Sequence, residues 1–341
     1  MQVVEKIHQH FNQVAGIDPY VVERARALCL GYFYKWGTPY TTLGIEVPFR
    51  LPLLSPETGQ PLEGYKPYTG IIDWCFRTDN GKTFFCDRKT TSRCGPDYWD
   101  KLKTDAQLSR YYLAAHQAGV KIDGFLWDVI VKPSLSVTDL TKNNILEIQT
   151  GHYCGLPITE PTTVEWKDKE TPHLHGLKVL AKCIKDADSV YQQRVLYRHE
   201  VDLVEYWQDM VTIQSQQQAI TCREGALRNR GNCTQFGKTC QFLSICANED
   251  PELTGFRTKA KREDDGAATF AGGVSITAEA EFLSCQRKWW LNRKENLEPL
   301  YQQADDTTDL GTLVHSGLEI VARATMSPNE TFRLPTGEVD E

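Results

Sequence analysis

The clearest pattern of apolar and polar positions lies in residues 70–90, where two short apolar runs flank a polar turn. The runs are GIIDWCF (70–76) and KTFFCD (82–87), and the turn is Asp79-Asn80-Gly81. Asn and Gly tolerate the positive φ angles that tight hairpin loops need, so this pattern predicts a β-hairpin.

Three charged side chains fall inside the predicted hairpin. With this loop, Asp73 lies opposite Asp87, and such cross-strand neighbours are roughly 5 Å apart on one face. Lys89 shares the face of Asp87 because side chains alternate along a strand. Unpaired charges among apolar strands are costly, so a divalent cation is a natural partner for the two carboxylates. The hairpin alone also fits a simpler interpretation, in which the acids and the lysine are solvated at strand ends.

Two further strands are predicted on either side of the hairpin in the chain. Upstream, the run GIEVPFRLP (44–52) has strand character and contains a single acid, Glu46. Downstream, the apolar run GFLWDVIV (124–131) has the length of a buried strand. The segment from Tyr98 to Ala115 lies between hairpin and last strand, and its pattern predicts a helix.

Two polar side chains of the predicted helix complete the pattern. Gln107 and Tyr111 are four residues apart and therefore share one helix face. The predicted order is strand with Glu46, strand with Asp73, strand with Asp87 and Lys89, helix with Gln107 and Tyr111, and strand.

This order resembles the PD-(D/E)xK nuclease superfamily, in the RecB-like branch that includes the CRISPR-associated iron–sulfur exonucleases. In that family the first Asp, the D-x-K pair and a Q-x-x-x-Y helix form the active site. The resemblance implies an α/β fold with a restriction-endonuclease-like core, in which helices flank a mixed central sheet. Ile72 stands where the family name has Pro. The residues that match the family's catalytic pattern are Asp73, Asp87, Lys89, Gln107 and Tyr111, with Glu46 completing the outer shell.

The eleven cysteines give a second, independent pattern. No secretory signal or membrane-spanning apolar run appears, so we expect a cytoplasmic, reducing location without disulfides. A cysteine cluster in such a protein is expected to bind metal. Several cysteines occur singly in apolar segments and look like small buried hydrophobes; they are Cys29, Cys75, Cys86, Cys154 and Cys183.

The cysteine cluster consists of Cys233, Cys240 and Cys246, with Cys222 upstream as a spare candidate. Its C-x6-C-x5-C spacing fits no C-x2-C zinc knuckle, so zinc is the alternative metal. The RecB-like branch carries three late cysteines of this kind and a distant fourth around a [4Fe–4S] cluster. The resemblance implies that Cys285 is the fourth, because SITAEAEFLSCQRKWWL (275–291) resembles the family's S/T…E…C-x-R-x-W segment.

A histidine motif follows the Cys285 segment. Residues 311–315 read GTLVH, which resembles the family's G-x-x-x-H motif, and a lone helical histidine is otherwise more often structural. The resemblance implies that His315 binds metal together with Asp73, Asp87 and the backbone carbonyl of Arg88. The implied ion is Mg²⁺ or Mn²⁺, because oxygen ligands suit both and an imidazole favours Mn²⁺.

These motifs occur in an unusual order, since the Cys285 and His315 segment opens the domain in the family and closes this chain. We interpret the chain as a circular permutant, with a truncated second copy as the alternative. A permutant predicts that Glu341 lies near Met1–Gln13, and the helix predicted at Val21–Trp36 then follows the His315 helix. The predicted parts are a nuclease core (1–190), a helical segment with the cluster cysteines (191–250), a linker (251–274) and a Cys/His helical segment that packs back on the core (275–341).

Composition and charge limit the function classes. With 341 residues and 40% hydrophobic residues, the chain can bury one large core or two modest ones. The net charge of −7 is unusual for a DNA-binding protein, although affinity depends on local charge. Basic residues adjoin Trp289 and Trp290, as a stacking surface for single strands requires, but a solvated helix face with core tryptophans fits equally. The basic residues are Arg223, Arg228, Arg230, Arg287, Lys288, Arg293 and Lys294.

The motifs together predict a metal-dependent DNA nuclease, in the first interpretation a single-strand exonuclease, that uses Mg²⁺ or Mn²⁺ and carries a [4Fe–4S] cluster. DNA, as single strands or duplex ends, is the expected partner, and no membrane association is expected. The alternatives are a catalytically silent DNA-binding or scaffold module with the cluster, and a zinc-stabilised interaction protein. Phage recombination, repair and CRISPR adaptation are all compatible with the sequence.

Overall fold

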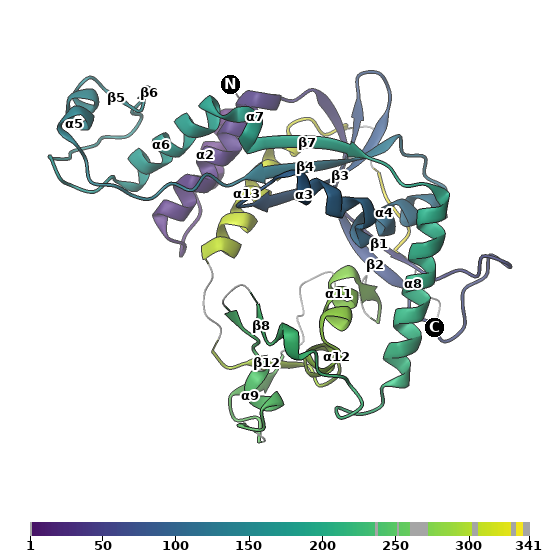
Figure 1. The fold of residues 1–341 in the computed structure, drawn as a ribbon. Helices are drawn as coiled ribbons and strands as arrows, with labels where there is room; N and C mark the ends of the chain where they lie inside the picture. Colours follow the sequence, from purple (N-terminus) through teal and green to yellow (C-terminus); the bar gives the residue numbers. More distant parts are fainter. Residues whose placement is uncertain are drawn as a thin grey trace.

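The computed structural model describes residues 2–235, 238–250, 252–259, 272–301, 306–328 and 332–336. Six strands of these residues form one mixed sheet (Figure 1). The strand order is β1 (Tyr40–Leu51), β2 (Tyr68–Thr78), β3 (Thr83–Thr91), β4 (Gly124–Val131) and β7 (Tyr191–Leu196), with β11 (Val274–Ser275) beside β2. The β3–β4 and β11–β2 pairs are parallel, and the others are antiparallel. The predicted α/β fold with a mixed central sheet is confirmed.

Local turn chemistry produces the predicted hairpin between β2 and β3. The Thr78 amide donates to the Lys82 carbonyl at 2.9 Å and closes the loop over Asp79-Asn80-Gly81. Gly81 adopts a φ of 80°, which a side chain would make unfavourable.

The two hairpin strands part at their inner end. Their ladder ends at the Trp74–Cys86 pair, one position before Asp73 and Asp87. Beyond this point β2 continues along β1 and β11, while β3 continues along β4. Strands β2 and β3 therefore separate at Asp73 and Asp87, and we call this gap in the sheet the opening.

Helices cover both faces of the sheet (Figure 1). On one face α4 (Ala106–Gln117) packs against strand residues such as Phe85 and Phe125. It follows α3 (Pro96–Asp100) and a 3₁₀ turn, Lys101–Thr104. On the other face α2 (Pro19–Trp36) and α13 (Asp306–Arg323) share a core with Ile130. Further elements are α1 (Gln2–Asn12), α5 (Lys142–Gln149), β5 (His152–Tyr153), β6 (Leu156–Pro157), α6 (Pro172–Lys185) and α7 (Ala187–Val190).

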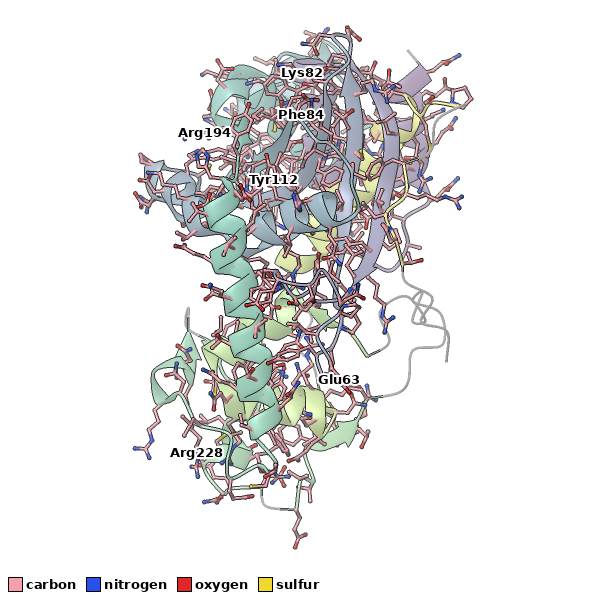
Figure 2. All side chains as sticks on the ribbon, turned by 90° about the vertical axis from the view of Figure 1, so that its right-hand side faces the viewer. Glu63, Lys82, Phe84, Tyr112, Arg194 and Arg228 are labelled. Atoms are coloured by element: carbon pink, nitrogen blue, oxygen red, sulfur yellow. The ribbon has the colours of Figure 1, made fainter. Side chains whose placement is uncertain are left out.

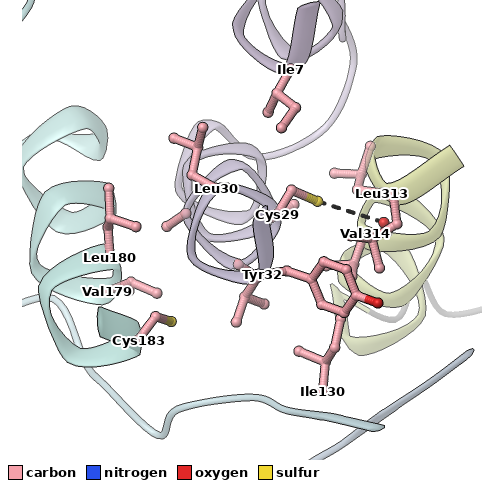
Figure 3. Close-up of a cluster of buried hydrophobic side chains, with 14 of the residues drawn as sticks. Ile7, Cys29, Leu30, Tyr32, Ile130, Val179, Leu180, Cys183, Leu313 and Val314 are labelled. Carbon is pink, nitrogen blue, oxygen red and sulfur yellow. Dashed lines mark hydrogen bonds between the residues drawn. The ribbon is translucent and has the colours of Figure 1, made fainter. Parts of the chain in front are cut away.

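The core on the second face places α2 between α6 and α13 (Figure 3). Cys29 is fully buried there, and its thiol donates to the Val314 carbonyl at 3.6 Å. A Cβ at position 317 would stand 2.6 Å from the Cys29 sulfur, so only glycine allows this helix separation. Cys75, Cys86 and Cys183 are buried as predicted, whereas Cys154 is exposed.

Helix α8 (Glu200–Ala219) leads from the sheet to a smaller lobe (Figure 1). Figure 2 shows Arg228 in this lobe, at the opposite end of the molecule from Lys82 in the hairpin. The lobe contains η2 (Arg230–Asn232), β8 (Thr234–Gln235), β9 (Lys238–Thr239), α9 (Leu243–Cys246), β10 (Phe256–Thr258), α11 (Ile276–Ser284), α12 (Gln286–Trp289), the π-helical turn Trp290–Lys294 and β12 (Leu297–Pro299).

A fully buried arginine joins the lobe to the core. The Arg110 guanidinium of α4 forms an ion pair with Glu279 of α11, which is also buried. The same guanidinium donates to the Thr69 carbonyl at 3.0 Å and to the Val274 carbonyl at 2.8 Å. Tyr206 of α8 accepts from Arg110 Nε at 2.9 Å and donates to Glu279 at 3.1 Å. Each charged group therefore has hydrogen-bond partners, as burial requires.

The structure differs from the sequence predictions in its element boundaries. The helix predicted at 98–115 is interrupted at Asp105, because this residue is extended and its side chain caps α4 by accepting from the Leu108 amide at 2.9 Å. Strand β7 lies beyond residue 190, yet it pairs with β4 and buries Tyr191 in the core.

The stretch predicted as a linker also contains structure. Phe256–Thr258 pairs with β12, and Phe256 packs on the small core of the lobe. The predicted neighbourhood of Glu341 lies outside the described residues.

A buried carboxylate, Glu170, holds together residues 132–171, which connect β4 to α6. Glu170 accepts hydrogen bonds from Tyr153 at 2.6 Å, Lys178 at 2.8 Å and His175 at 3.2 Å, and Thr138 adds two more. Burial alone would raise the pKa of Glu170, but these donors lower it to about 2. The ionised form is thus the one that the fold stabilises.

We predict that Glu170→Gln loses a pH-dependent contribution to stability. Because the folded-state pKa lies below the unfolded value, the contribution is complete above about pH 4.5 and is lost as the pH falls toward about 2. Urea unfolding should therefore give a wild-type advantage at pH 6 that shrinks at pH 3. An advantage that is constant across this range would contradict the assignment.

Candidate active site

The two hairpin carboxylates lie where β2 and β3 part. Asp87 is fully buried, whereas the Asp73 side chain is 19% exposed. Asp73 Oδ2 accepts a hydrogen bond from the Arg88 amide at 2.8 Å. This bond across the opening fixes Asp73 beside the strand that carries Asp87.

Lys89 forms an ion pair with Asp87, with 2.7 Å between Nζ and Oδ2. Burial raises the pKa of Asp87, an effect that Asp73 reinforces and the Lys89 ammonium opposes. Burial would lower the pKa of Lys89, but Asp87 outweighs it and raises that pKa. Lys89 is therefore a cation at neutral pH and has no lone pair to act as a general base.

The two polar residues of α4 form a hydrogen-bonded chain to the sheet. The Gln107 side-chain amide donates to Asp87 Oδ1 and to the Tyr111 hydroxyl, both at 2.8 Å. The Tyr111 hydroxyl donates to the Ile71 carbonyl at 2.6 Å. The α4 residues thus orient Asp87 and leave its second oxygen to Lys89.

Helix α13 brings His315 to the same opening from the other face. The distance from His315 Nδ1 to Asp73 Oδ2 is 3.8 Å, and the ring hydrogen-bonds to the Arg88 backbone. Burial lowers the pKa of His315 despite the Asp73 carboxylate, so the imidazole is neutral at pH 7. A Cβ at Gly311 would stand 3.2 Å from Thr90 Oγ1, which explains how the helix approaches β3 so closely.

The Arg88 side chain points away from this opening and is buried. Its Nε lies 3.5 Å from Asp128 Oδ2, and its guanidinium lies 4.4 Å from the Trp74 ring centroid. Tyr32 donates to Asp128 at 2.6 Å. Sequence reasoning missed Asp128, although an acid within the apolar run 124–131 was a signal that this strand holds a buried partner.

Glu46 lies on β1 opposite Asp73, since its neighbours Ile45 and Val47 pair with Trp74 and Ile72. Its φ is 49°, a value that is strained for a residue with a side chain. Desolvation by surrounding residues, together with Asp73 and Glu319, raises the pKa of Glu46 to about 7. A third carboxylate therefore lies beside Asp73 on the neighbouring strand.

The donor set at the opening fits a divalent cation by its chemistry. It offers two carboxylates and a neutral imidazole beside the Arg88 backbone, and Asp87 Oδ2 is buried with no hydrogen bond beyond its ion pair. Such oxygen and nitrogen ligands suit Mg²⁺ and Mn²⁺. As they stand, however, no three His, Cys, Asp or Glu side chains in the described part of the chain are close enough to hold an ion.

The four predicted cluster cysteines line one cavity of about 480 Å³ in the smaller lobe. The Asn229 amide donates to the Cys285 sulfur at 3.4 Å. The same cavity is lined by four cationic residues, Arg228, Arg230, Lys238 and Lys288. Cys222 is exposed and does not line it.

The tryptophans of this lobe are not a free stacking surface. Trp289 is buried and packs edge-on against Phe282. Trp290 is half-buried, and its indole donates to Glu295 at 2.8 Å. Arg287 is buried and donates to the Ala226 carbonyl at 3.1 Å. For Trp289 the structure supports the core interpretation.

The fold is that of an α/β protein and is consistent with the restriction-endonuclease-like fold. Its candidate site combines Asp73, Asp87 and Lys89 where β2 and β3 separate. Residues 273–341 match the family model of the PD-(D/E)XK nuclease superfamily. This match supports the superfamily predicted from the sequence, for the last segment of the chain. The matched residues include Glu279, Cys285 and His315, and the hairpin lies outside them. Members of this superfamily typically use Mg²⁺ or Mn²⁺. No curated protein and no solved structure matches the chain.

No helix in the described ranges has both the length and the apolar character needed to span a bilayer.

We predict that Asp87→Asn and His315→Ala each weaken Mn²⁺ binding by at least about tenfold, because each removes a ligand from a small donor set. The readout is the rise in Tm on adding Mn²⁺, which depends on the affinity for the folded state. The matched control is Asp188→Asn, since Asp188 is fully exposed and pairs with Lys35. If Mn²⁺ raises the Tm of all three variants equally, the ion does not bind at this opening.

Proposed function

We propose that this protein is a metal-dependent DNA nuclease of the RecB-like type, acting as an exonuclease on single strands. One observation carries the proposal. Asp73, Asp87, Lys89 and His315 come from three elements and both sides of the sheet, yet they meet where β2 and β3 part. A purely structural role would not require the buried Asp87 carboxylate there, because desolvation of a charged group is costly even when Lys89 pairs with it.

In this proposal Asp73, Asp87, His315 and the Arg88 carbonyl hold Mg²⁺ or Mn²⁺. The bound ion would supply Lewis acidity and a water of lowered pKa. Glu46 stands beside Asp73 as an additional carboxylate for the outer shell.

The protein's own residues then have separate roles in cleavage. The ion pair with Asp87 keeps Lys89 protonated. In this proposal its ammonium stabilises the negative charge that develops on the phosphate. Gln107 holds Asp87, and Tyr111 holds the Ile71 carbonyl of β2, so in this proposal they keep the site in the geometry that receives the strand backbone. His315 remains neutral and so keeps its lone pair for the ion.

We predict that Lys89→Ala abolishes cleavage but preserves DNA binding, because the lysine acts mainly on the transition state. End-labelled single-stranded DNA with Mg²⁺ or Mn²⁺ measures cleavage, and fluorescence anisotropy measures binding. Lys169→Ala is the matched control, because Lys169 is exposed, pairs with Asp139 and lies in residues 132–171 between β4 and α6. Wild-type cleavage by Lys89→Ala would refute the site.

The cysteine cavity supports the further proposal of a [4Fe–4S] cluster held by Cys233, Cys240, Cys246 and Cys285. Zinc binds sulfur at about 2.3 Å, so its ligands must converge on a single point. The four thiols line one cavity of about 480 Å³, which is wide for a single ion. The surrounding cations would offset thiolate charge, and the Asn229 amide already donates to Cys285.

We predict that anaerobically purified protein is brown and absorbs broadly near roughly 400 nm, as Cys₄-ligated iron–sulfur centres do. Cys285→Ser should lose the colour and the bound iron, while Cys222→Ser should keep both. Colourless protein with stoichiometric zinc would establish the zinc-stabilised alternative instead.

We also propose that the chain is a circular permutant of one nuclease domain. The support is that β11, Glu279 and His315 of the last segment all contact the core of residues 2–235. In a truncated second copy these residues would have no reason to complete the first site.

A further inference from the structure

An aromatic pair extends the candidate active site along the sheet. Trp127 stands opposite Asp87 in the β3–β4 ladder and is buried. The Lys89 ammonium lies 5.6 Å from the centroid of the Trp127 ring. The Trp127 indole N–H then donates to the Tyr98 hydroxyl at 3.2 Å. Tyr98 is therefore one side chain removed from the D-x-K pair.

The Tyr98 hydroxyl is fixed as an acceptor and keeps its own proton to donate. A phenol has one proton and can accept as well, and no acceptor for this proton occurs among the described residues. Burial raises the pKa of Tyr98, so the proton stays on at neutral pH. The Trp127 indole links this donor to the candidate site, because the Lys89 ammonium lies against the same indole.

The ammonium group of Lys101 lies over the ring of Tyr98. The exposed Lys101 ammonium is 4.3 Å from the centroid of Tyr98. Lys89, Tyr98 and Lys101 thus present donors in a row that leads from the buried site to the surface. A row of this kind suits an extended ligand with repeated anionic acceptors, as in a phosphodiester backbone.

We propose that Tyr98 and Lys101 bind the phosphate next to the scissile one and so set the path of the strand into the site. This inference rests on the proposed nuclease function and adds two substrate-binding residues to it. Tyr98 supplies one hydrogen bond of fixed direction, and Lys101 supplies charge. Neither residue touches the reacting phosphate.

The test uses Tyr98→Phe and Lys101→Gln in the full chain, with Tyr34→Phe as the matched control, because Tyr34 is an exposed tyrosine of α2. Tyr98→Phe removes only the hydroxyl and should raise KM about tenfold at nearly constant kcat. Lys101→Gln should lower the slope of log affinity against log salt by about one, whereas Tyr98→Phe should leave the slope unchanged. Unchanged KM and slope in active variants would overturn the inference.

A chemical probe distinguishes phosphate binding from packing. Each oligonucleotide carries a single neutral methylphosphonate, placed at a different linkage in each. At one linkage this replacement should lower the affinity of the wild type as much as Tyr98→Phe lowers it for the unmodified strand. The methylphosphonate at that linkage should not lower the affinity of the Tyr98→Phe variant any further. Additive losses at every position would show that Tyr98 acts only by packing. Should wild type cleave no strand at all, the nuclease proposal itself fails, and that result is distinct from either outcome above.

Discussion

The buried ion pair between Arg110 and Glu279 is the interaction on which the arrangement of the molecule depends. Arg110 is wholly inaccessible, yet it reaches a carbonyl of β2, a carbonyl of β11, Tyr206 of α8 and the carboxylate of α11. Removal of one partner from such a pair typically costs about 3–5 kcal/mol, a large part of the roughly 5–15 kcal/mol that stabilises a domain. Arg110 is on α4, three residues after Gln107, so the same helix anchors the last segment of the chain and orients Asp87.

The electrostatics of the opening follow from its place inside the fold. Burial raises the pKa of Asp87, and desolvation by neighbouring groups, with the nearby acids Asp73 and Glu319, raises that of the surface residue Glu46 to about 7. Burial also lowers the pKa of His315. All three shifts disfavour charge, and Lys89 offsets only part of the negative charge that remains. A divalent cation would favour the ionised acids and the neutral imidazole together, which is why the donor set has the character of a metal site.

The hairpin and the strand at 124–131 could be predicted from the sequence, because a turn and an apolar strand each depend on residues that are close together in the chain. The break at Asp105 was missed because the residues around it have helical character, and only the cap decides the boundary. Burial of Arg110 and of Trp289 depends on contacts over long sequence distances, which periodicity does not encode. The meeting of His315 with Asp73 was predicted from a resemblance, because nothing in residues 306–323 specifies which strand the helix approaches. The positive φ of Glu46 had no sequence signal at all.

The segment matched by the superfamily model contributes residues to the sheet, to the buried ion pair and to both candidate sites. It adds β11 to the sheet, Glu279 to the buried pair, Cys285 to the cysteine cavity and His315 to the opening. Glu279 lies within α11, and Cys285 caps the end of this helix six positions later. A group that binds in the cavity and orders Cys285 would therefore also hold Glu279 against Arg110. The iron–sulfur proposal thus gives the cluster a mechanical role at the active site, through α11 and α4, without any electron transfer.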